Sequence, residues 1–286
     1  MRQCHSTATA KNNRMESEAI ITPVMNELTA ENILSRMKDD RRSHAVMVFN
    51  SLDSTNRHAM MLAAESAGDG TVVIADTQTG GRGRFGRAWA SPPGVNLYMS
   101  LILHSDMAPR FAGIFSLLGA VAVVNAVRRV SGVDAVIKWP NDVLIGGQKL
   151  AGVLVESNIS NSRINHLVLG IGLNLNIIVS DMPAEIRETA TSLLEICGRV
   201  TDRAGMAAAL IDEIDSMIDL SERAGTAAVL DEWRRHSITM DREIAVSDRC
   251  GSFSAHAVDV DDTGGLILRL SDGTFRTATS GEVTLK

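Results

Sequence analysis

Apolar and polar positions along the first half of the chain alternate between strand-like and helix-like spacing. The runs at residues 45–49, 71–75 and 96–103 predict strands, and the last is apolar on both faces, as a buried strand is. Between the first two runs, Ser54 or Thr55 begins a helix that continues to about Ala67 and ends at Gly68. Residues 109–130 predict the longest apolar helix of the chain.

The same pattern continues with more strands and then helices. Residues 134–139, 149–157 and 165–176 predict strands, and residues 201–220 and 224–235 predict helices with one apolar stripe. A short capped helix is predicted after Thr29. This order indicates an α+β domain with a mixed β-sheet flanked by helices, which we assign to residues 43–236. Residues 1–42, polar and mixed in charge, predict a partly disordered N-terminal extension.

The character of the sequence changes after His236. Short strand-like runs at residues 243–246, 253–258, 266–270 and 274–278 are separated by turn signals such as Asp272-Gly273. Residues 237–286 therefore predict a small C-terminal β-barrel domain. A unit of this size buries little core of its own, so we expect it to pack on the larger domain.

Composition and charge exclude several classes of partner. The 286 residues are 45% hydrophobic and 22% charged, with a formal net charge of -6. Negative charge of that size argues against nucleic acid and anionic membranes as partners, and we expect no apolar run of membrane-spanning length. The 3 cysteines are far apart in sequence and form no metal-ligand spacing, which favours a reducing, cytoplasmic location.

The most informative segment is a loop at residues 80–89 with the sequence Gly-Gly-Arg-Gly-Arg-Phe-Gly-Arg-Ala-Trp. Its arginines, Arg82, Arg84 and Arg87, carry permanent charge and planar donor groups suited to phosphate and carboxylate, and its glycines allow close approach to a ligand. The spacing formally matches a dinucleotide-binding motif, but that motif relies on backbone groups rather than arginines. We interpret the segment as a mobile anion-binding loop; the alternative is a solvated basic turn.

Two further clusters follow predicted strands. Lys138-Trp139-Pro140-Asn141-Asp142 holds a lysine and an aspartate that form either a simple ion pair or a phosphate contact beside a metal-binding carboxylate. A hairpin through residues 145–148 would return Lys149 to Asp142. In Gly170-Ile171-Gly172-Leu173-Asn174-Leu175-Asn176 the glycines suit a close approach by a backbone or a ligand, and the asparagine amides suit a purine edge.

Taken together, these motifs resemble those of the biotin–protein ligases. The resemblance rests on the arginine loop, Ser-Pro-Pro-Gly-Val-Asn-Leu-Tyr-Met-Ser at 91–100, Lys-Trp-Pro-Asn-Asp at 138–142, Lys-Leu-Ala-Gly-Val-Leu-Val-Glu at 149–156 and the glycine–asparagine run at 170–176, all in the family's order. It covers residues 45–176 strongly and the C-terminal unit by architecture. One departure is Phe85, where many relatives carry another arginine, and it predicts weaker ligand retention without loss of activity.

The resemblance implies a class II synthetase-like, biotin–lipoate ligase catalytic domain, an SH3-like C-terminal barrel and a two-step reaction. Biotin and ATP give biotinyl-5′-adenylate, and a lysine of a biotin carboxyl carrier domain then accepts the biotin, with Mg²⁺ as the metal. The catalytic residues implied are Lys149, Arg84 and Asp142, the last also as the magnesium ligand. The implied biotin-binding residues are Ser54, Thr55, Asn56, Gln78, Arg82, Gly83, Arg84 and Lys149. The implied ATP- and adenylate-binding residues are Arg82, Arg84, Arg87, Trp89, Lys138, Asn141 and Asn174.

Other readings stay open at this point. Some relatives are also transcriptional repressors with an N-terminal DNA-binding domain, but the residues before the first predicted strand are neither basic nor numerous enough for a winged helix, so we expect the ligase-only form. A lipoate or octanoyl ligase of related fold and a non-catalytic biotin-binding protein are the alternatives. The family contains monomers and homodimers, and both remain possible here.

Overall fold

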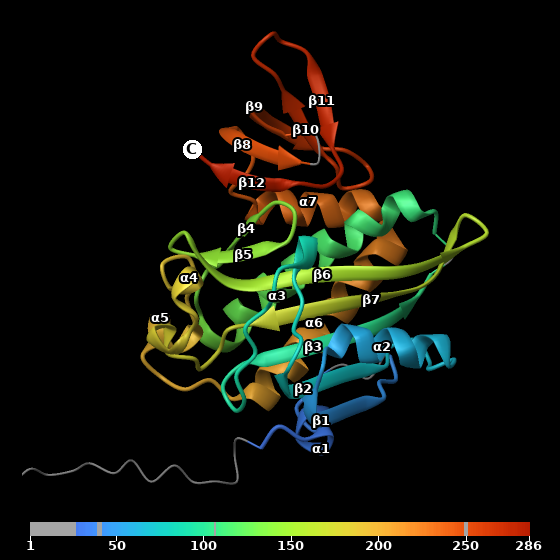
Figure 1. The fold of residues 1–286 in the computed structure, drawn as a ribbon. Coiled ribbons are helices and arrows are strands. Elements are labelled where there is room, and N and C mark those ends of the chain that lie inside the picture. The colour runs from blue at the N-terminus through green and yellow to red at the C-terminus, as the bar shows by residue number, and fades with distance from the viewer. Residues whose placement is uncertain (1–26, 39–41, 106, 249–250) are drawn as a thin grey trace, which may run out of the picture.

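The computed structural model describes residues 27–286 except 39–41, 106 and 249–250 (Figure 1). The predicted disorder of residues 1–42 lies mostly outside these residues. Within them, the short helix expected after Thr29 is α1, Ala30–Leu34, and the Thr29 side chain accepts a hydrogen bond from the Asn32 N–H as its N-cap.

A mixed sheet forms the centre of the larger domain. Across the described residues it has seven strands in the order β1-β2-β3-β7-β6-β5-β4, and only β1 and β2 pair in parallel. The strands are β1 Val46–Leu52, β2 Val72–Gln78, β3 Leu97–His104, β4 Val136–Lys138, β5 Asp142–Ile145, β6 Gln148–Ser160 and β7 Arg163–Leu173. The central position of β3 explains why its sequence is apolar on both faces.

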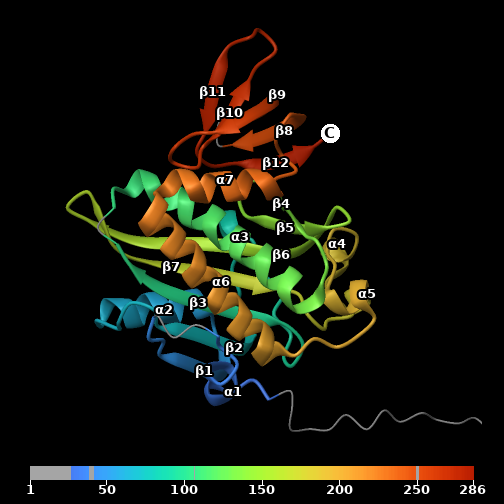
Figure 2. The ribbon, with the colours of Figure 1, turned by 180° about the vertical axis from the view of Figure 1, so that it is seen from behind.

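Helices cover both faces of this sheet. The long helices α3 (Ala112–Ser131), α6 (Arg203–Ala224) and α7 (Thr226–His236) pack together on one face, which Figure 2 shows from behind. Helix α2, Thr55–Ala64, lies on the opposite face, where Ser54 caps its first turn. Two short helices, α4 (Ala184–Arg187) and α5 (Leu193–Cys197), lie beyond the end of β7. The expected mixed sheet flanked by helices is confirmed.

The prediction that no apolar segment reaches membrane-spanning length was wrong. Within the described residues, the helical segment Pro109–Ser131 passes that test by length and composition, although 61% of its most apolar window is buried inside the protein. Apolar residues surround this helix on all sides because the sheet covers one side of it and α6 and α7 cover another. It is the core helix of the larger domain.

The C-terminal residues form a second sheet above the first, beside α7 (Figure 1). In the part of the chain that the structure describes, it has five antiparallel strands in the order β11-β10-β9-β8-β12. They are β8 Arg242–Asp248, β9 Gly251–Val260, β10 Leu266–Arg269, β11 Phe275–Ala278 and β12 Glu282–Leu285. The buried Trp139 indole N–H donates to the Gly264 carbonyl at 3.0 Å, which ties this sheet to the larger domain as expected.

Candidate active site

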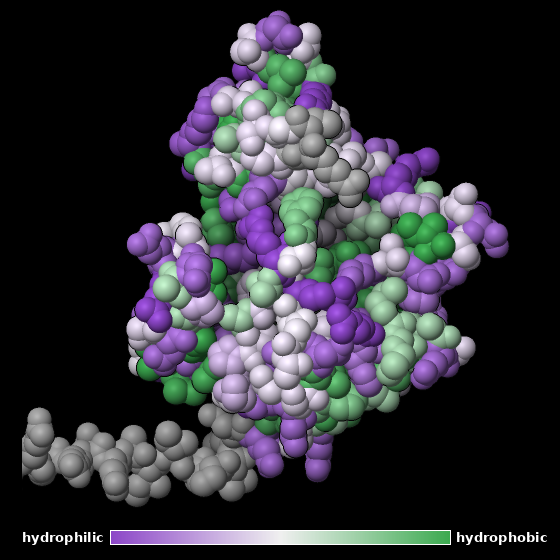
Figure 3. Space-filling model, in the orientation of Figure 1, coloured by the Kyte–Doolittle hydropathy of each residue, from purple (hydrophilic) through white to green (hydrophobic). Residues whose placement is uncertain are grey.

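One pocket brings together the catalytic and binding residues that the resemblance implies. It encloses about 500 Å³ between the end of the mixed sheet, the arginine loop and the C-terminal domain. Hydrophilic side chains gather along the hollow between the two domains (Figure 3). The lining includes every predicted site residue, namely Ser54, Thr55, Asn56, Gln78, Arg82, Gly83, Arg84, Arg87, Trp89, Lys138, Asn141, Asp142, Lys149 and Asn174. Volumes of this size suit a small ligand.

The arginine loop folds into a compact hairpin over the pocket. The Gly83 N–H donates to the Arg87 carbonyl at 2.7 Å, and the Trp89 N–H donates to the Gly81 carbonyl at 2.9 Å. Its tip contains a residue with a positive φ, Phe85 at 57°, which is a conformation that non-glycine residues seldom adopt. The Arg84 guanidinium lies 4.8 Å from the centroid of the Phe85 ring. The Phe85 ring therefore packs on its charged neighbour.

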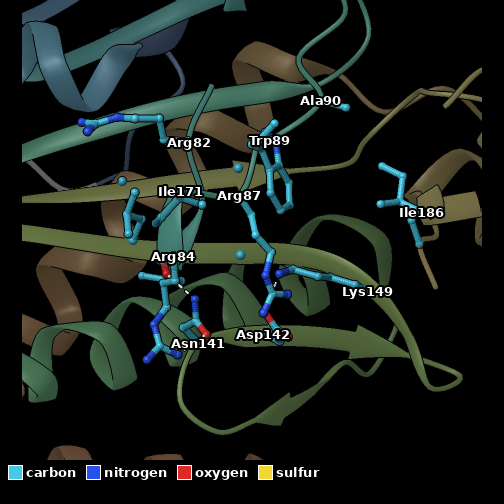
Figure 4. Close-up of a pocket in the computed structure, with 18 of the residues that line it drawn as sticks. Arg82, Arg84, Arg87, Trp89, Ala90, Asn141, Asp142, Lys149, Ile171 and Ile186 are labelled. Atoms are coloured by element: carbon cyan, nitrogen blue, oxygen red, sulfur yellow. Dashed lines mark hydrogen bonds and ion pairs between the residues drawn. The ribbon is translucent and has the colours of Figure 1, made fainter. Parts of the chain in front are cut away.

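Each loop arginine contacts an acceptor from another element. Arg82 donates to Glu156 of β6 at 2.9 Å. Arg84 donates to the Asn141 side-chain oxygen at 3.3 Å, as Figure 4 shows. Arg87 pairs with Glu282 of the C-terminal domain. The sequence analysis singled out Asn141 but neither of the two glutamates. A second C-terminal group, the Gly281 carbonyl, accepts from Arg84 at 3.2 Å. The C-terminal domain therefore completes the wall of the pocket, with Gly281, Glu282 and Val283 in its lining.

The charge of Arg84 is only partly compensated. Burial lowers the pKa of Arg84, and Asp142 acts in the opposite direction while the like charge of Arg87 adds to the lowering. A half-buried guanidinium in this position gains from an anion that enters the pocket.

Opposite the loop, two lysines converge on one carboxylate. The hairpin between β5 and β6 turns at Gly146 and Gly147, whose φ angles are 59° and 83°. It brings Lys149 Nζ to 2.5 Å from Asp142 Oδ1, so the predicted return of Lys149 is confirmed. Lys138 Nζ lies 3.3 Å from the other carboxylate oxygen. Burial opposes ionisation of Asp142, but Lys149 and then Lys138 outweigh it and lower its pKa below the ordinary value.

The floor of the pocket is made of glycines on the two longest strands. Gly152 of β6 pairs with Gly172 of β7, and the Trp89 indole lies on both. A Cβ atom at Gly172 would lie 2.4 Å from the indole, and one at Gly152 would lie 3.0 Å from it. The close approach that these glycines predict is thus made by a tryptophan side chain, whose ring centroid is 5.4 Å from Lys149 Nζ.

One end of the pocket is a hydrogen-bonded polar cluster at the start of α2. The Thr55 N–H donates to Gln78 Oε1 at 2.8 Å, and the Gln78 amide donates to the Ser91 hydroxyl at 3.0 Å. The Ser100 hydroxyl lies 2.8 Å from Thr55 Oγ1 and donates to the Asn56 amide oxygen at 2.7 Å. Ser54 has the ordinary N-cap role, because it accepts from the Arg57 N–H at 3.5 Å.

The asparagines of the glycine–asparagine run are held by the protein. Asn174 lines the pocket, yet its amide donates to the Thr191 carbonyl at 3.0 Å, so its contact with a base stays a prediction. Asn176 does not line this pocket, and its amide bonds both the N–H and the carbonyl of Thr201. These bonds tie the segment after β7 to Thr191 and Thr201, which flank α5 in the sequence.

Metal-ligating side chains do not cluster in the part of the chain that the structure describes. It has no group of three or more histidine, cysteine, aspartate or glutamate side chains that could hold a metal ion. Asp142 is the carboxylate nearest the lysines of the pocket, and it offers oxygen ligands of the type that Mg²⁺ prefers. Further ligands for that metal would come from water or from a bound phosphate group.

Comparison with known families defines the class of this fold and site. Residues 48–174, which carry the arginine loop and both lysines, match the model of the biotin/lipoate A/B protein ligase family. Residues 239–286 match the model of the biotin protein ligase C terminal domain. The chain therefore has the domain pair of the protein ligases that handle these cofactors.

Individual relatives show to which family within this class the chain is similar. The chain is 33% identical over 247 residues to the bifunctional ligase/repressor BirA of Bacillus subtilis, with 86% of this chain and 76% of that protein covered. It is 34% identical over 239 residues to the biotin–[acetyl-CoA-carboxylase] ligase of Mycobacterium tuberculosis, with 82% and 86% covered. The chain belongs to the biotin protein ligase family.

A solved structure supports the same relationship. The biotin protein ligase of Aquifex aeolicus, in complex with biotin and ATP, superimposes with a TM-score of 0.71 at 27% identity, covering 84% of this chain and 98% of that one. The described fold is therefore that of a biotin protein ligase, with its C-terminal sheet in place.

Proposed function

We propose that this chain is an ATP-dependent biotin–protein ligase whose reaction takes place in the pocket between the arginine loop, the β5–β6 hairpin and the C-terminal domain. The observation that carries the proposal is the convergence of Lys149, Lys138 and three loop arginines on one cavity of an acidic protein. Such a cavity suits a reaction in which a carboxylate and a triphosphate must meet.

The two ends of the pocket suit the two substrates. The end at Thr55, Asn56 and Gln78 offers several hydrogen-bonding groups in fixed positions, as the cyclic urea head of biotin requires. Ile186 lies on the opposite side of the pocket from Arg82 (Figure 4), and together with Met182 and Ala190 it gives that side an apolar wall suited to a nucleobase. Lys149 lies between the two ends, where the biotin carboxylate and the α-phosphate would meet.

The first step joins two anions. A biotin carboxylate oxygen attacks the α-phosphorus of ATP, an O–P bond forms, and pyrophosphate leaves with the electrons of the broken bond. Lys149, Arg84 and Arg87 reduce the repulsion between the reactants and hold them in line. The lysine must leave Asp142 in part to reach the ligand, and Lys138 then remains to balance that carboxylate.

The second step needs no nucleophile from the enzyme. The amine of an acceptor lysine attacks the acyl carbon of the adenylate, an amide forms, AMP leaves and the amine proton passes to solvent. We propose that the acceptor is a lysine of a biotin carboxyl carrier domain and that the reaction takes place in the cytoplasm. The arginine loop would retain the reactive adenylate until this acceptor arrives.

We also propose that Mg²⁺ accompanies the nucleotide. The Asp142 carboxylate would contribute an oxygen ligand and the phosphates would contribute the others, which is a common arrangement for this metal. When bound, the ion would neutralise charge on the leaving pyrophosphate.

The test is biotin-dependent exchange of labelled pyrophosphate into ATP by the purified chain, with lipoate and octanoate as matched alternatives. The proposal predicts exchange with biotin and none with the other two acids. Exchange with lipoate or octanoate alone would favour the related ligases, and biotin binding without exchange would indicate a non-catalytic biotin-binding protein. Transfer of biotin to an isolated carrier domain then tests the second step.

A further inference from the structure

Glu156 lies outside the pocket lining but contacts two residues that form it. Its Oε2 atom accepts a hydrogen bond from the Asn56 amide at 2.9 Å and another from the Arg82 guanidinium at 2.9 Å. Asn56 belongs to the polar end of the pocket, and Arg82 belongs to the arginine loop. One carboxylate oxygen therefore links the start of α2 to the loop that lies over the pocket.

This link fixes which way the Asn56 amide points. A carboxylate and a backbone carbonyl accept hydrogen bonds but cannot donate them. The Asn56 amide nitrogen faces two such acceptors, Glu156 and the Leu154 carbonyl at 3.2 Å. Its oxygen must therefore face Ser100 and the backbone of Gly170, where there is no room for another atom, since a Cβ on Gly170 would lie 1.9 Å from it.

The link also holds the loop. Arg82 has a solvent-exposed side chain on a glycine-rich hairpin, and its guanidinium pairs with the carboxylate of Glu156 on the mixed sheet. Strand alternation places Glu156 on the same face of β6 as Gly152, so it extends the pocket floor toward α2. Losing the carboxylate would free both the amide and the guanidinium.

We propose that Glu156 is a positioning residue for biotin: it orients Asn56 and holds Arg82, and thereby couples the head-group end of the pocket to the arginine loop. This inference rests on the proposed ligase function and names the residue on which biotin recognition depends without direct contact. Because the residue acts before chemistry, its removal affects biotin binding more than the rate of the bound complex.

The experiment compares Glu156→Ala, Glu156→Gln and Glu222→Ala in pyrophosphate exchange. Glu222 is a matched control, because it also accepts from an arginine, Arg42 at 2.7 Å, but this arginine does not line the pocket as Arg82 does. Losing charge-assisted hydrogen bonds predicts a rise in KM for biotin of about 10- to 100-fold in Glu156→Ala, with a smaller change in kcat. Glu156→Gln keeps an acceptor oxygen at the same place and should recover part of the loss, while Glu222→Ala should match the wild type.

Two further readouts separate positioning from general stability. In an Arg82→Ala background, Glu156→Ala should raise KM by a smaller factor than it does alone, because one of its partners is already gone. Crystals of Glu156→Gln or Glu156→Ala should show Arg82 displaced or the Asn56 amide rotated. An unchanged biotin KM with both side chains in place would overturn the inference, and active wild-type enzyme in the same assay would still support the ligase function.

Discussion

Lys149 Nζ lies 2.5 Å from Asp142 Oδ1, although the two residues belong to different strands of a hairpin. The turn glycines and the bulge between Val143 and Leu144 set this register, so the lysine faces the pocket instead of the opposite face of the sheet. The Asp142 carboxylate fixes Lys149 in position. Because Asp142 also pairs with Lys138, Lys149 is still free to exchange this carboxylate for a substrate oxygen.

Lys149→Ala should abolish most adenylate formation while leaving the fold intact. Removing one preorganised charge that stabilises the transition state lowers rates by roughly 100- to 1,000-fold. Pyrophosphate exchange measures the loss, and thermal unfolding checks the fold. Lys38→Ala, on an exposed position away from the pocket, serves as the control. Exchange close to the wild-type rate in the Lys149 variant would remove this residue from the mechanism.

Arg84→Gly should release the adenylate before transfer. Arg84 joins the loop to Asn141 and to the Gly281 carbonyl, so the glycine variant loses contacts with both domains and gains backbone freedom at the tip of the hairpin. Free biotinyl-adenylate acylates exposed lysines without selection. Labelling of a bystander protein, detected with streptavidin, should exceed that of the wild type, and equal labelling would count against the retention role of this loop.

Gly172→Ala should displace Trp89 from the pocket floor. The new Cβ would lie 2.4 Å from the indole, so the ring must move. Overpacking of this kind costs about 1–3 kcal/mol, which the loop can relieve by opening. Trp139, which also lines the pocket, and Trp233 are both buried, so comparison with Trp89→Phe assigns a shift in tryptophan fluorescence to Trp89. Gly68→Ala is the control, because a Cβ there meets nothing within 4 Å. An unchanged spectrum and unchanged biotin affinity would contradict this description of the floor.

Stability should depend on the protonation of His44. Burial alone would lower the pKa of His44, but hydrogen bonds from its ring to Asp215 and to the Gly70 carbonyl, each 2.7 Å, outweigh burial and raise it. Arg42, the other nearby charge, acts to lower it. A raised pKa means that this stabilisation is complete below the unfolded value of about 6.5 and is lost as the pH rises through the folded value.

The corresponding measurement is urea unfolding of the wild type and His44→Gln between pH 5.5 and 9. Losing a hydrogen bond to a charged group should make the variant about 1–3 kcal/mol less stable at the low end. That difference should shrink as the pH rises. A constant difference across the range would show that the imidazole does not change its charge with folding.

Local sequence patterns predicted the central elements well where burial dictates composition. Strand β3 and helix α3 are apolar on all sides because they lie in the middle of the core, and Gly132, at a φ of 76°, ends α3 near where the pattern stops. The four-residue strands β5 and β12 escaped prediction, whereas β10 and β11, which are equally short, were predicted with the help of turn signals such as Asp272-Gly273. The helices α4 and α5 are too short for an apolar period to show.

The motifs also predicted the residues that line the pocket, but of the ion pairs within it they predicted only that of Lys149 with Asp142. Arg82 and Glu156 are 74 residues apart, and Arg87 and Glu282 are 195 apart, so no spacing rule connects them. The one available signal is strand alternation, which puts Glu156 on the same face as Gly152. Contacts between the loop and the C-terminal domain depend on how two separate sheets pack. The sequence pattern along one strand does not predict that packing.

The most direct test of the account is a crystal structure of this chain with biotin and ATP bound. The account predicts the biotin ring at Thr55, Asn56 and Gln78, and its activated carboxylate and the adenylate phosphate within hydrogen-bond distance of Lys149 and of Arg82 or Arg84. If both molecules bind well away from these three cationic side chains, the proposed joining of vitamin and nucleotide in this pocket is wrong.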